Sequence, residues 1–271
     1  MSRPRWLVYL IKKAYPGRYL AAQATKVPGL GRLVDRWLFD GDDLMYLPQD
    51  SLVPVNEAVD LPGEMVLPSQ VVAHFIEQAS AHWIMNDCLC RAGAGCQDYP
   101  VELGCLFLGE AAEGINPKLG RRVSKEEALA HVERCREAGL VHLVGRNKLD
   151  TVWLGVGPGD RLLTICNCCP CCCLWGVLPH LAPHIGAKIT RMPGVNVAVN
   201  GRCVGCGTCA EGICFADAIC LVDGHAVIGE ACRGCGRCVD ACPQDAIELT
   251  IEPQAAVAQS IARISPLVDV S

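Results

Sequence analysis

The chain has 271 residues, enough for two domains, and its 20 cysteines lie in a sequence that is 51% hydrophobic with a formal net charge of −5. It contains no stretch of 18 uncharged apolar residues, so we expect no membrane-spanning helix. Many cysteines are adjacent or one residue apart, which suits disulfide bonds poorly, and no secretory signal is recognisable. We therefore expect reduced thiols in the cytoplasm of an anaerobe.

The first 36 residues differ in charge from the rest, with eight basic residues and one acid, Asp35. An apolar run at 6–11, followed by two lysines, predicts a basic amphipathic helix. Such a helix can lie peripherally on the cytoplasmic face of a membrane, or pack on the protein's own core or on a partner subunit. Residues 40–68 are rich in Pro, Asp and Gly and predict an irregular connector, so we assign 1–68 to a basic N-terminal helix and a Pro-rich connector.

A Cys-rich domain is expected over residues 69–190. Ser69 is placed to cap a helix running to about Asn86, because apolar residues recur at helical spacing after it. Ser124 and Glu127 form a capping box that opens a second helix. Strands are expected at 140–144, 151–154 and 161–165. A helix followed by a β-hairpin is the outline of a winged-helix unit, so the domain is predicted to be mostly helical with a winged-helix-like unit.

Two cysteine tracts mark this domain, and chance does not explain ten cysteines in two short segments. They are Cys88, Cys90, Cys96 and Cys105 in the first tract, and Cys166, Cys168, Cys169, Cys171, Cys172 and Cys173 in the second. Thiolates at this density select iron–sulfur clusters, zinc or copper(I). The first tract could form one four-thiolate site, or each cluster could take ligands from both tracts. We expect one or two additional iron–sulfur clusters of [4Fe–4S] type, with zinc or a metallothionein-like store as the alternatives.

Four residues near or outside the tracts have roles that can be stated in advance. Arg91 is expected to balance the charge of a cluster, to bind an anion, or to lie in a surface salt bridge. His142 is expected in the core or at a helix cap rather than as a ligand. Cys135 and Cys220 are expected to be small buried hydrophobic residues.

The last third of the chain carries two regular cysteine runs, and we assign 191–253 to them and 254–271 to a tail or helix. The runs are Cys203-x₂-Cys206-x₂-Cys209-x₄-Cys214 and Cys232-x₂-Cys235-x₂-Cys238-x₃-Cys242 followed by Pro243. Zinc sites usually pair two C-x₂-C units across a longer gap or include His, so the pattern favours iron. The extra residue in the first run should bulge its loop.

Small residues and an internal repeat support this interpretation. The gaps of the two runs contain Gly205, Gly207, Gly234 and Gly236, which let backbone N–H groups approach sulfur. Segments 215–219 and 243–247 repeat one another, and each leads into a short predicted strand.

These features resemble bacterial two-cluster ferredoxins over roughly residues 195–252. The resemblance implies an α+β chain that ends in a pseudo-twofold domain of two ββα repeats. It also implies two [4Fe–4S] clusters, in which the last cysteine of each run reaches the other run's cluster. The ligands would then be Cys203, Cys206, Cys209 and Cys242 for the first cluster, and Cys232, Cys235, Cys238 and Cys214 for the second.

Over about residues 70–250, the chain also resembles a group of anaerobe iron–sulfur proteins with an ordered series of short motifs. In this chain the motifs are CLCR at 88–91, GCLFLG at 104–109, EEAL at 126–129, GLVH at 139–142 and CNCCPCCC at 166–173. The resemblance implies an iron–sulfur electron carrier and no particular reaction.

The sequence favours an electron-transfer protein or subunit that relays low-potential electrons to a partner redox enzyme. Redox proteins would serve as donor and acceptor, because no nucleotide-binding motif is evident. A redox enzyme with an N-terminal iron–sulfur active site is one alternative. A redox-sensing DNA-binding regulator and a metal-delivery protein are others, although the acidic body of the chain disfavours nucleic acid.

Overall fold

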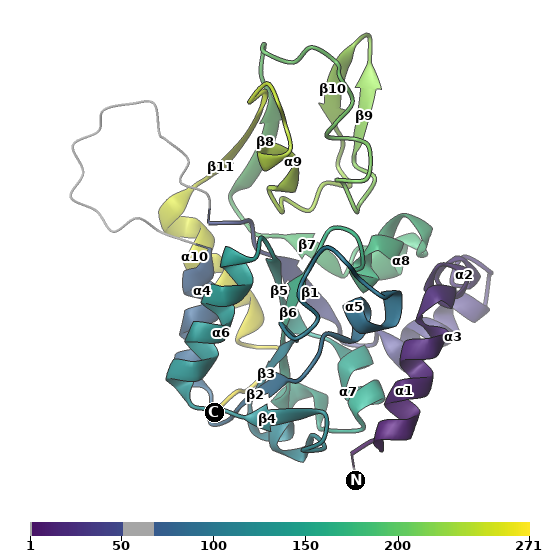
Figure 1. The fold of residues 1–271 in the computed structure, drawn as a ribbon, viewed down its shortest axis with the longest axis vertical. Helices are drawn as coiled ribbons and strands as arrows, with labels where there is room; N and C mark the ends of the chain where they lie inside the picture. Colours follow the sequence, from purple (N-terminus) through teal and green to yellow (C-terminus); the bar gives the residue numbers. More distant parts are fainter. Residues whose placement is uncertain (1, 51–67) are drawn as a thin grey trace.

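The computed structural model describes residues 2–50 and 68–271, and one seven-stranded sheet lies at its centre (Figure 1). The strands are β1 (Asp43–Tyr46), β2 (His82–Met85), β3 (Leu106–Leu108), β4 (Gly120–Arg122), β5 (Val141–Arg146), β6 (Leu163–Cys168) and β7 (Ile189–Arg191), in the order β4-β2-β3-β6-β5-β1-β7. Neighbours pair antiparallel except β1 and β7, which are parallel. The chain is thus α+β, but the expectation of a mostly helical Cys-rich domain is wrong.

Helices cover both faces of this sheet (Figure 1). One face carries α4 (Ser69–Gln78), α6 (Lys125–Glu137) and α10 (Pro253–Ile264), and the other carries α1 (Arg5–Ala14), α2 (Arg18–Ala24), α3 (Leu30–Leu38), α5 (Leu89–Ala94), α7 (Lys148–Leu154) and α8 (Pro183–Gly186). Strand alternation supplies both layers: Leu106 and Leu108 of β3 join the core under α4, whereas Phe107 joins the core that contains Val8 of α1.

The C-terminal unit (residues 195–251) packs against one end of the sheet (Figure 1). It contains β8 (Val195–Val199), β9 (Ile219–Val222), β10 (His225–Ile228), the short helix α9 (Arg237–Asp240) and β11 (Ile247–Ile251). Its first and last strands, β8 and β11, pair antiparallel, and β9 pairs with β10. After β11 the chain returns as α10, which packs on α4, so the expected tail or helix is a helix.

The helix expected over 69–86 is shorter than predicted. Helix α4 ends at Gln78 because Ala79 is extended, with φ −74° and ψ 135°, and the chain then enters β2. Trp83 pairs with Phe107 of β3 and Arg122 of β4. Trp83 continues the helical spacing of the apolar residues in α4. Its pairing with β3 and β4, and not this spacing, determines that the segment is a strand.

The strand expected at 151–154 is the helix α7, so the winged-helix outline is wrong. Side chains at the start of α7 satisfy one another: Asn147 donates to Asp150 (2.6 Å), Trp153 donates to Asp150 (2.6 Å), and the Thr151 hydroxyl donates to the Lys148 carbonyl (2.7 Å). These local bonds outweigh the strand preference of the Thr-Val-Trp sequence. Strands β5 and β6 pair as neighbours, but they belong to the central sheet.

Other local predictions have mixed outcomes. The capping box is confirmed, with Ser124 accepting from the Glu127 amide (3.2 Å) and Glu127 accepting from the Ser124 amide (2.9 Å). The N-terminal helix is present as α1. The connector expected at 40–68 includes β1, which pairs with both β5 and β7, and its part at 51–67 lies outside the described residues.

Candidate metal centre

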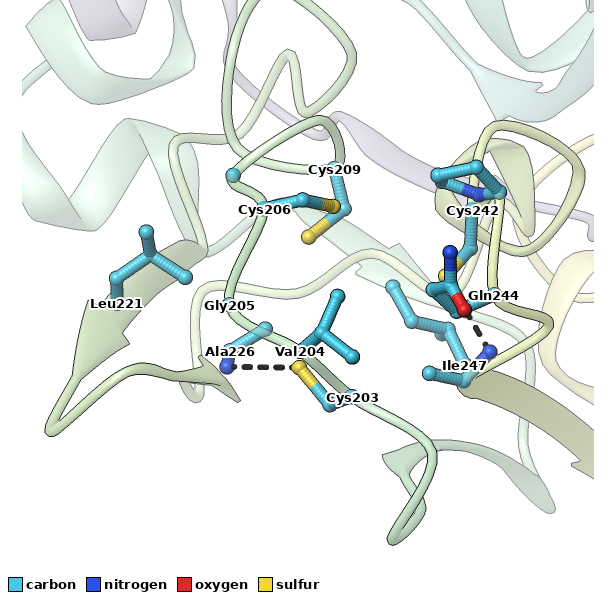
Figure 2. A pocket seen from close by; sticks show the side chains of 13 residues that line it. Cys203, Val204, Gly205, Cys206, Cys209, Leu221, Ala226, Cys242, Gln244 and Ile247 are labelled. Carbon is cyan, nitrogen blue, oxygen red and sulfur yellow. Dashed lines mark hydrogen bonds between the residues drawn. The ribbon is translucent and has the colours of Figure 1, made fainter.

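Four of the eight C-terminal cysteines, Cys203, Cys206, Cys209 and Cys242, line one cavity, which we call the outer site (Figure 2). The amide of Ala226 donates to Cys203 Sγ (3.4 Å), and the amide of Ala246 donates to Cys242 Sγ (3.3 Å). Sulfurs that converge on a cavity and accept N–H bonds fit an iron–sulfur cluster, whose potential such bonds tune.

The other four, Cys214, Cys232, Cys235 and Cys238, form what we call the inner site. Burial, followed by the charges of the other three thiols, raises the pKa of Cys238 to about 12. Cys214 and Cys232 pack in one core cluster with Cys238 and in another with Cys235, so the four side chains are neighbours. The amide of Gly234 donates to Cys232 Sγ (3.3 Å), so backbone N–H groups approach sulfur here as well.

The two internal repeats have the same local geometry. The amide of Ala218 donates to Cys214 Sγ at 3.3 Å, the distance found between Ala246 and Cys242. Asp217 and Asp245, at equivalent places, both adopt positive φ (51° and 47°). The runs differ where the extra residue falls: residues 237–240 form α9, whereas residues 208–213 form turns and bends.

Glycine is required at two of the predicted gap positions. Gly205 has φ +67°, and a Cβ there would lie 2.1 Å from the Gly224 carbonyl oxygen. Gly234 has φ +63°, and its Cβ would lie 2.8 Å from Val195 Cγ1. Both positions therefore combine a left-handed backbone with a close approach that excludes other side chains.

The two tracts of the sheet unit (residues 2–50 and 68–191) meet at the end of β6. Alternation along β6 directs Cys166 and Cys168 to the face that carries α5 and α7, whereas Leu163 and Ile165 join the core on the opposite face. Tyr46 on β1 shares the face of the cysteines, and its hydroxyl lies 3.8 Å from Cys168 Sγ and 3.7 Å from Cys173 Sγ.

Seven of the ten tract cysteines line a second cavity of about 60 Å³. Six of them belong to this cavity alone, and we call it the six-thiol cavity: Cys88, Cys90, Cys105, Cys166, Cys168 and Cys173. The seventh, Cys169, also belongs to a second group of thiols. Cys105 Sγ lies 3.9 Å from Cys166 Sγ, and a hydrogen bond from Cys168 lowers the pKa of Cys173 to about 7. A space this large holds more than a single water molecule, and six thiols around it fit a thiolate-bound metal group.

Cys169 and the three remaining tract cysteines form a second group, the thiol tetrad of Cys96, Cys169, Cys171 and Cys172. Their Sγ atoms all lie within 4.8 Å of one another. Both the tetrad and the six-thiol cavity combine cysteines from the two tracts. The first tract thus does not form one site by itself, because Cys96 lies in the tetrad and the other three line the six-thiol cavity.

Two buried arginines lie beside the thiols. Arg91 is fully buried and donates to the backbone carbonyls of Asn167 (2.8 Å) and Leu103. Burial disfavours its charge, but the thiolate charges of Cys88 and Cys169 raise its pKa above the ordinary value. Arg91 is therefore not a surface salt-bridge residue, and a buried guanidinium beside thiols can balance the negative charge of a bound cluster.

Arg237 connects the C-terminal unit to the sheet unit. It lies between two inner-site cysteines and donates to the Cys168 carbonyl oxygen at 2.5 Å. Its Nε and Nη1 atoms are buried and have no hydrogen-bond partner among the described residues. A buried, incompletely satisfied cation is costly unless an anion is near, so its position fits a site that holds negative charge.

An aromatic contact also joins the C-terminal unit to the sheet unit. Phe215, directly after Cys214 of the inner site, packs on Tyr46 with ring centroids 4.7 Å apart. The Tyr46 hydroxyl reaches Cys168 and Cys173, as described above. The sequence did not identify Tyr46, Phe215 and Arg237 as site residues. The one signal that could have found Arg237 is its position inside a cysteine run.

Three other candidates, His142, Cys135 and Cys220, are members of neither thiol group, although Cys135 packs in the same core cluster as Cys169 and Cys172. His142 is buried and its Nδ1 pairs with Asn167 Oδ1 (2.9 Å), and burial lowers its pKa to about 4. Cys135 is fully buried, as expected. Cys220 is exposed, so that expectation is wrong; it lies on the β9–β10 hairpin, which has few residues to cover it.

Comparison with known proteins identifies one part of the chain. Residues 225–248, which include the second cysteine run, match the family model described as 4Fe-4S binding domain. Searches of the curated proteins and of the solved structures found no match. Among residues 2–50 and 68–271, no helix is long and apolar enough to cross a membrane. The chain thus contains an iron–sulfur-binding unit joined to a sheet unit rich in thiols.

Proposed function

We propose that the protein is an electron-transfer protein or subunit that relays low-potential electrons from the C-terminal unit to the six-thiol cavity. Cys203, Cys206, Cys209 and Cys242 would bind one [4Fe–4S] cluster, and Cys214, Cys232, Cys235 and Cys238 a second. When bound, such clusters supply one-electron carriers. At least one additional iron–sulfur cluster would be held at the six-thiol cavity.

The observation that carries this proposal is the double connection between the inner site and the six-thiol cavity. Arg237 extends from the inner run to the backbone of Cys168, and Phe215 packs on Tyr46, whose hydroxyl contacts two cavity thiols. A buried cation and packed rings between the two sites keep water out and hold the sites at a fixed separation. A separate storage site for metal would need neither contact.

The exposure of the outer site also indicates where a partner protein would donate electrons. Cys206 of the outer site is exposed, and the neighbouring Val204 is 65% exposed, so a redox protein donor can approach there. The inner site is more enclosed, because none of its four cysteines is exposed. Electrons would enter at the outer site, pass to the inner site and the cavity, and leave to a partner redox enzyme in the cytoplasm.

A second candidate function is a redox enzyme with its site at the six-thiol cavity. The cavity is also lined by Trp153 and Trp175, which gives it an apolar wall. If a cluster leaves part of this space open, a small molecule could bind beside it. A signal from the third centre that shifts when small molecules are added would favour this function over a simple relay.

The proposal is tested by measuring iron and acid-labile sulfide in anaerobically purified wild type and Cys168→Ser. We expect the variant to lose about four iron and four sulfide per chain while the two C-terminal clusters keep their EPR signals. Cys135→Ser is the matched control, because Cys135 is buried but lies in neither thiol group. Unchanged iron in Cys168→Ser would overturn the additional cluster.

A further inference from the structure

The thiol tetrad is more tightly spaced than the other cysteine groups. Its four Sγ atoms lie within 4.8 Å of one another, and Cys96 Sγ lies 3.6 Å from Cys171 Sγ. In the part of the chain that the structure describes, no other set of three or more cysteine, histidine or acidic side chains converges this closely. The outer-site cysteines share a cavity but do not approach one another to this degree.

Sulfur spacing distinguishes a single metal ion from a cluster. Four thiolates bound tetrahedrally to one Zn²⁺ at about 2.3 Å must lie roughly 3.8 Å apart. The terminal thiolates of a [4Fe–4S] cluster lie roughly 6 Å apart, because four iron ions and their sulfides stand between them. All the tetrad distances lie below the second spacing, and the distance between Cys96 and Cys171 is close to the first, so a cluster would force the thiols outward.

The surroundings of the tetrad suit a closed, four-ligand site. Cys169 and Cys172 are buried and pack in a core cluster with Leu140. The Tyr15 hydroxyl donates to the Cys172 carbonyl (2.6 Å), which fixes the backbone of the loop. Cys96 follows α5, and the other three cysteines follow β6, so an ion here would tie these two elements together beside the six-thiol cavity.

We propose that Cys96, Cys169, Cys171 and Cys172 bind one tetrahedral divalent metal ion, Zn²⁺ or Fe²⁺, and not a cluster. Four thiolates leave no open position on such an ion, as in structural zinc sites. The ion holds the end of α5, and with it Cys88 and Cys90, against the six-thiol cavity. The tetrad shares only Cys169 with the cavity that the relay uses, and no step of the relay rests on Cys169.

The test is a count of zinc, iron and acid-labile sulfide per chain in anaerobically purified full-length protein. Clusters of [4Fe–4S] type contain equal iron and sulfide. We expect either one zinc per chain or one iron in excess of sulfide, and these two results identify the ion. Absence of zinc together with equal iron and sulfide would overturn the proposal.

A matched pair of variants locates the ion. Cys171→Ser, at the exposed member of the tetrad, should lose the single ion and keep its sulfide. Cys105→Ser, in the six-thiol cavity, should lose iron and sulfide together. Loss of several iron with equal sulfide from Cys171→Ser would show a cluster at the tetrad and overturn the proposal. An unchanged Cys105→Ser would contradict the relay and leave the tetrad result intact.

A second inference follows from an independent feature, the surface of α1, α2 and α3. Nine of the thirteen exposed large hydrophobic residues that the structure describes lie between residues 6 and 37. They are Trp6, Tyr9, Leu10, Tyr19, Leu20, Val27, Leu30, Leu33 and Trp37. Arg5, Lys13, Arg32 and Arg36 are exposed among them. We call this apolar and basic surface the N-terminal face.

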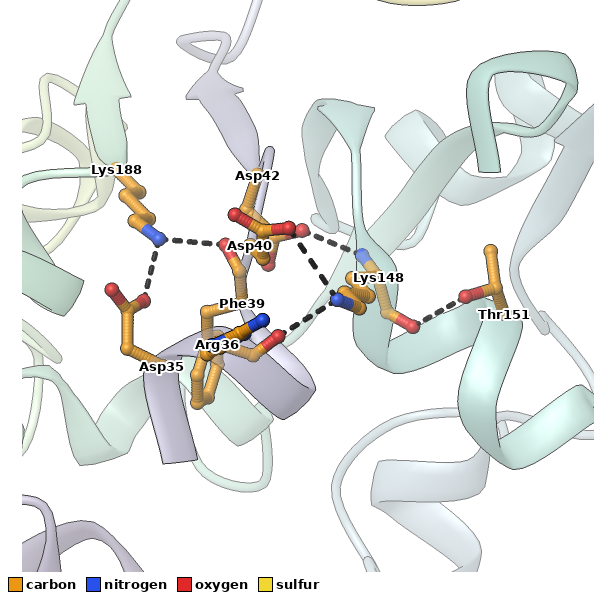
Figure 3. Close-up of polar contacts among 8 residues, drawn as sticks. All are labelled: Asp35, Arg36, Phe39, Asp40, Asp42, Lys148, Thr151 and Lys188. Carbon is orange, nitrogen blue, oxygen red and sulfur yellow. Dashed lines mark hydrogen bonds and ion pairs between the residues drawn. The ribbon is translucent and has the colours of Figure 1, made fainter. Parts of the chain in front are cut away.

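The inner side of α3 is firmly attached, so its exposed side is not a loosely packed core. Lys188 Nζ donates to Asp35 (2.5 Å) and to the Phe39 carbonyl (2.7 Å), and Lys148 Nζ donates to the Arg36 carbonyl (2.8 Å) (Figure 3). Asp35 is the only acid of the first 36 residues, and Lys188 neutralises it. The N-terminal face is left with positive charge.

We propose that the N-terminal face binds peripherally to a membrane surface rich in anionic lipid. Exposed Trp, Tyr and Leu side chains enter the boundary between headgroups and acyl chains, and Lys and Arg attract anionic headgroups. The charge of the face complements such a surface. A partner protein that bound the same face would need no anionic lipid. Dependence of binding on anionic lipid therefore distinguishes a membrane from a partner protein.

The test is co-sedimentation of the iron-loaded protein with vesicles of phosphatidylcholine alone or mixed with phosphatidylserine. We expect binding to the mixed vesicles that weakens with salt, and a loss of roughly tenfold or more in the Trp6→Asp, Trp37→Asp double variant. Val222→Asp, an exposed apolar residue on the C-terminal unit, is the control and should bind normally. Failure to bind mixed vesicles, or equal binding by the double variant, would overturn the proposal.

Discussion

The C-terminal unit and the sheet unit gather cysteines by different means. In the C-terminal unit, eight cysteines come from two runs, and tight turns at glycines such as Gly205 and Gly234 bring them to the outer and inner sites. In the sheet unit, ten cysteines come from α5, its flanking loops, β6 and the loop after it. Their grouping depends on strand pairing and on which face of β6 each cysteine occupies.

The difference shows which thiol sites are determined by the local sequence and which by the tertiary fold. Spacing along the chain brings sulfurs together where the loop itself wraps the ligand. In the sheet unit, neighbours in sequence differ in their groups: Cys168 lines the six-thiol cavity alone, whereas Cys169 also belongs to the tetrad. Substitutions that act on one unit should therefore leave the metal content of the other unchanged.

The largest effect is expected from Cys238→Ser in the inner site. Loss of this buried thiol should remove about four iron and four sulfide per chain and abolish magnetic coupling between the two C-terminal clusters. Reduction of the third centre by an external donor should slow, because the inner site lies between the two. Iron analysis and freeze-quench EPR measure both effects, and Cys220→Ser is the control, with an exposed thiol outside every group. Retention of all iron by Cys238→Ser would contradict the ligand set.

Gly205→Ala should have a smaller, local effect on the outer site. The alanine must adopt φ +67° with its Cβ directed at the Gly224 carbonyl, which costs more than about 1 kcal/mol. We expect partial loss of iron and a lower melting temperature in thermal unfolding. Gly201→Ala is the matched control, because nothing lies within 4 Å of its Cβ position. Equal iron and equal melting temperature in the two variants would show that the loop does not need this geometry.

Arg237→Gln tests the connection between the two units without removing a ligand. Loss of a buried positive charge beside the inner site and the six-thiol cavity should lower their reduction potentials by roughly 50–100 mV, because reduction adds negative charge. Iron content should stay the same. A potentiometric EPR titration measures the shift, with the exposed Arg202→Gln as control. Unaltered potentials would mean that the Arg237 charge does not act on either site.

The smallest effect is expected from Ser124→Ala, at the start of α6. The substitution removes the hydroxyl that accepts from the Glu127 amide and should lower the free energy of unfolding by about 1 kcal/mol. Metal content and potentials should not change, because Ser124 caps the first turn of α6, whereas this helix contacts the tetrad near its other end, at Cys135. Denaturant unfolding under anaerobic conditions measures the loss. A change in iron content would show that the two ends of α6 are coupled.

The features that could be predicted from the sequence are those that depend on neighbours along the chain. The capping box at Ser124 needs four consecutive residues, and the glycine requirement at Gly205 follows from its place inside a cysteine run. The central sheet was missed because its strands are short and pair across long separations, as Asp43 does with Arg146. The segment after Lys148 reads as a strand by composition, but the bonds made by Asp150 make it a helix.

The site in the sheet unit shows the same limit. Cysteine density predicts that the tracts gather thiols into metal sites, but the division into a tetrad and a six-thiol cavity could not be predicted. Arg91 and Arg237 gain their roles from burial, and the contact between Phe215 and Tyr46 joins residues that lie far apart along the chain. These relations exist only in the folded chain.

The most direct test of the relay is an anaerobic EPR titration of the full chain that looks for magnetic interaction between the inner site and a third centre. The account predicts a third signal, beyond the coupled pair of C-terminal clusters, whose relaxation changes when the inner site is reduced. It also predicts that Cys168→Ser loses this signal. A spectrum fully explained by two coupled clusters, with about eight iron per chain in clusters, would contradict the relay to the six-thiol cavity.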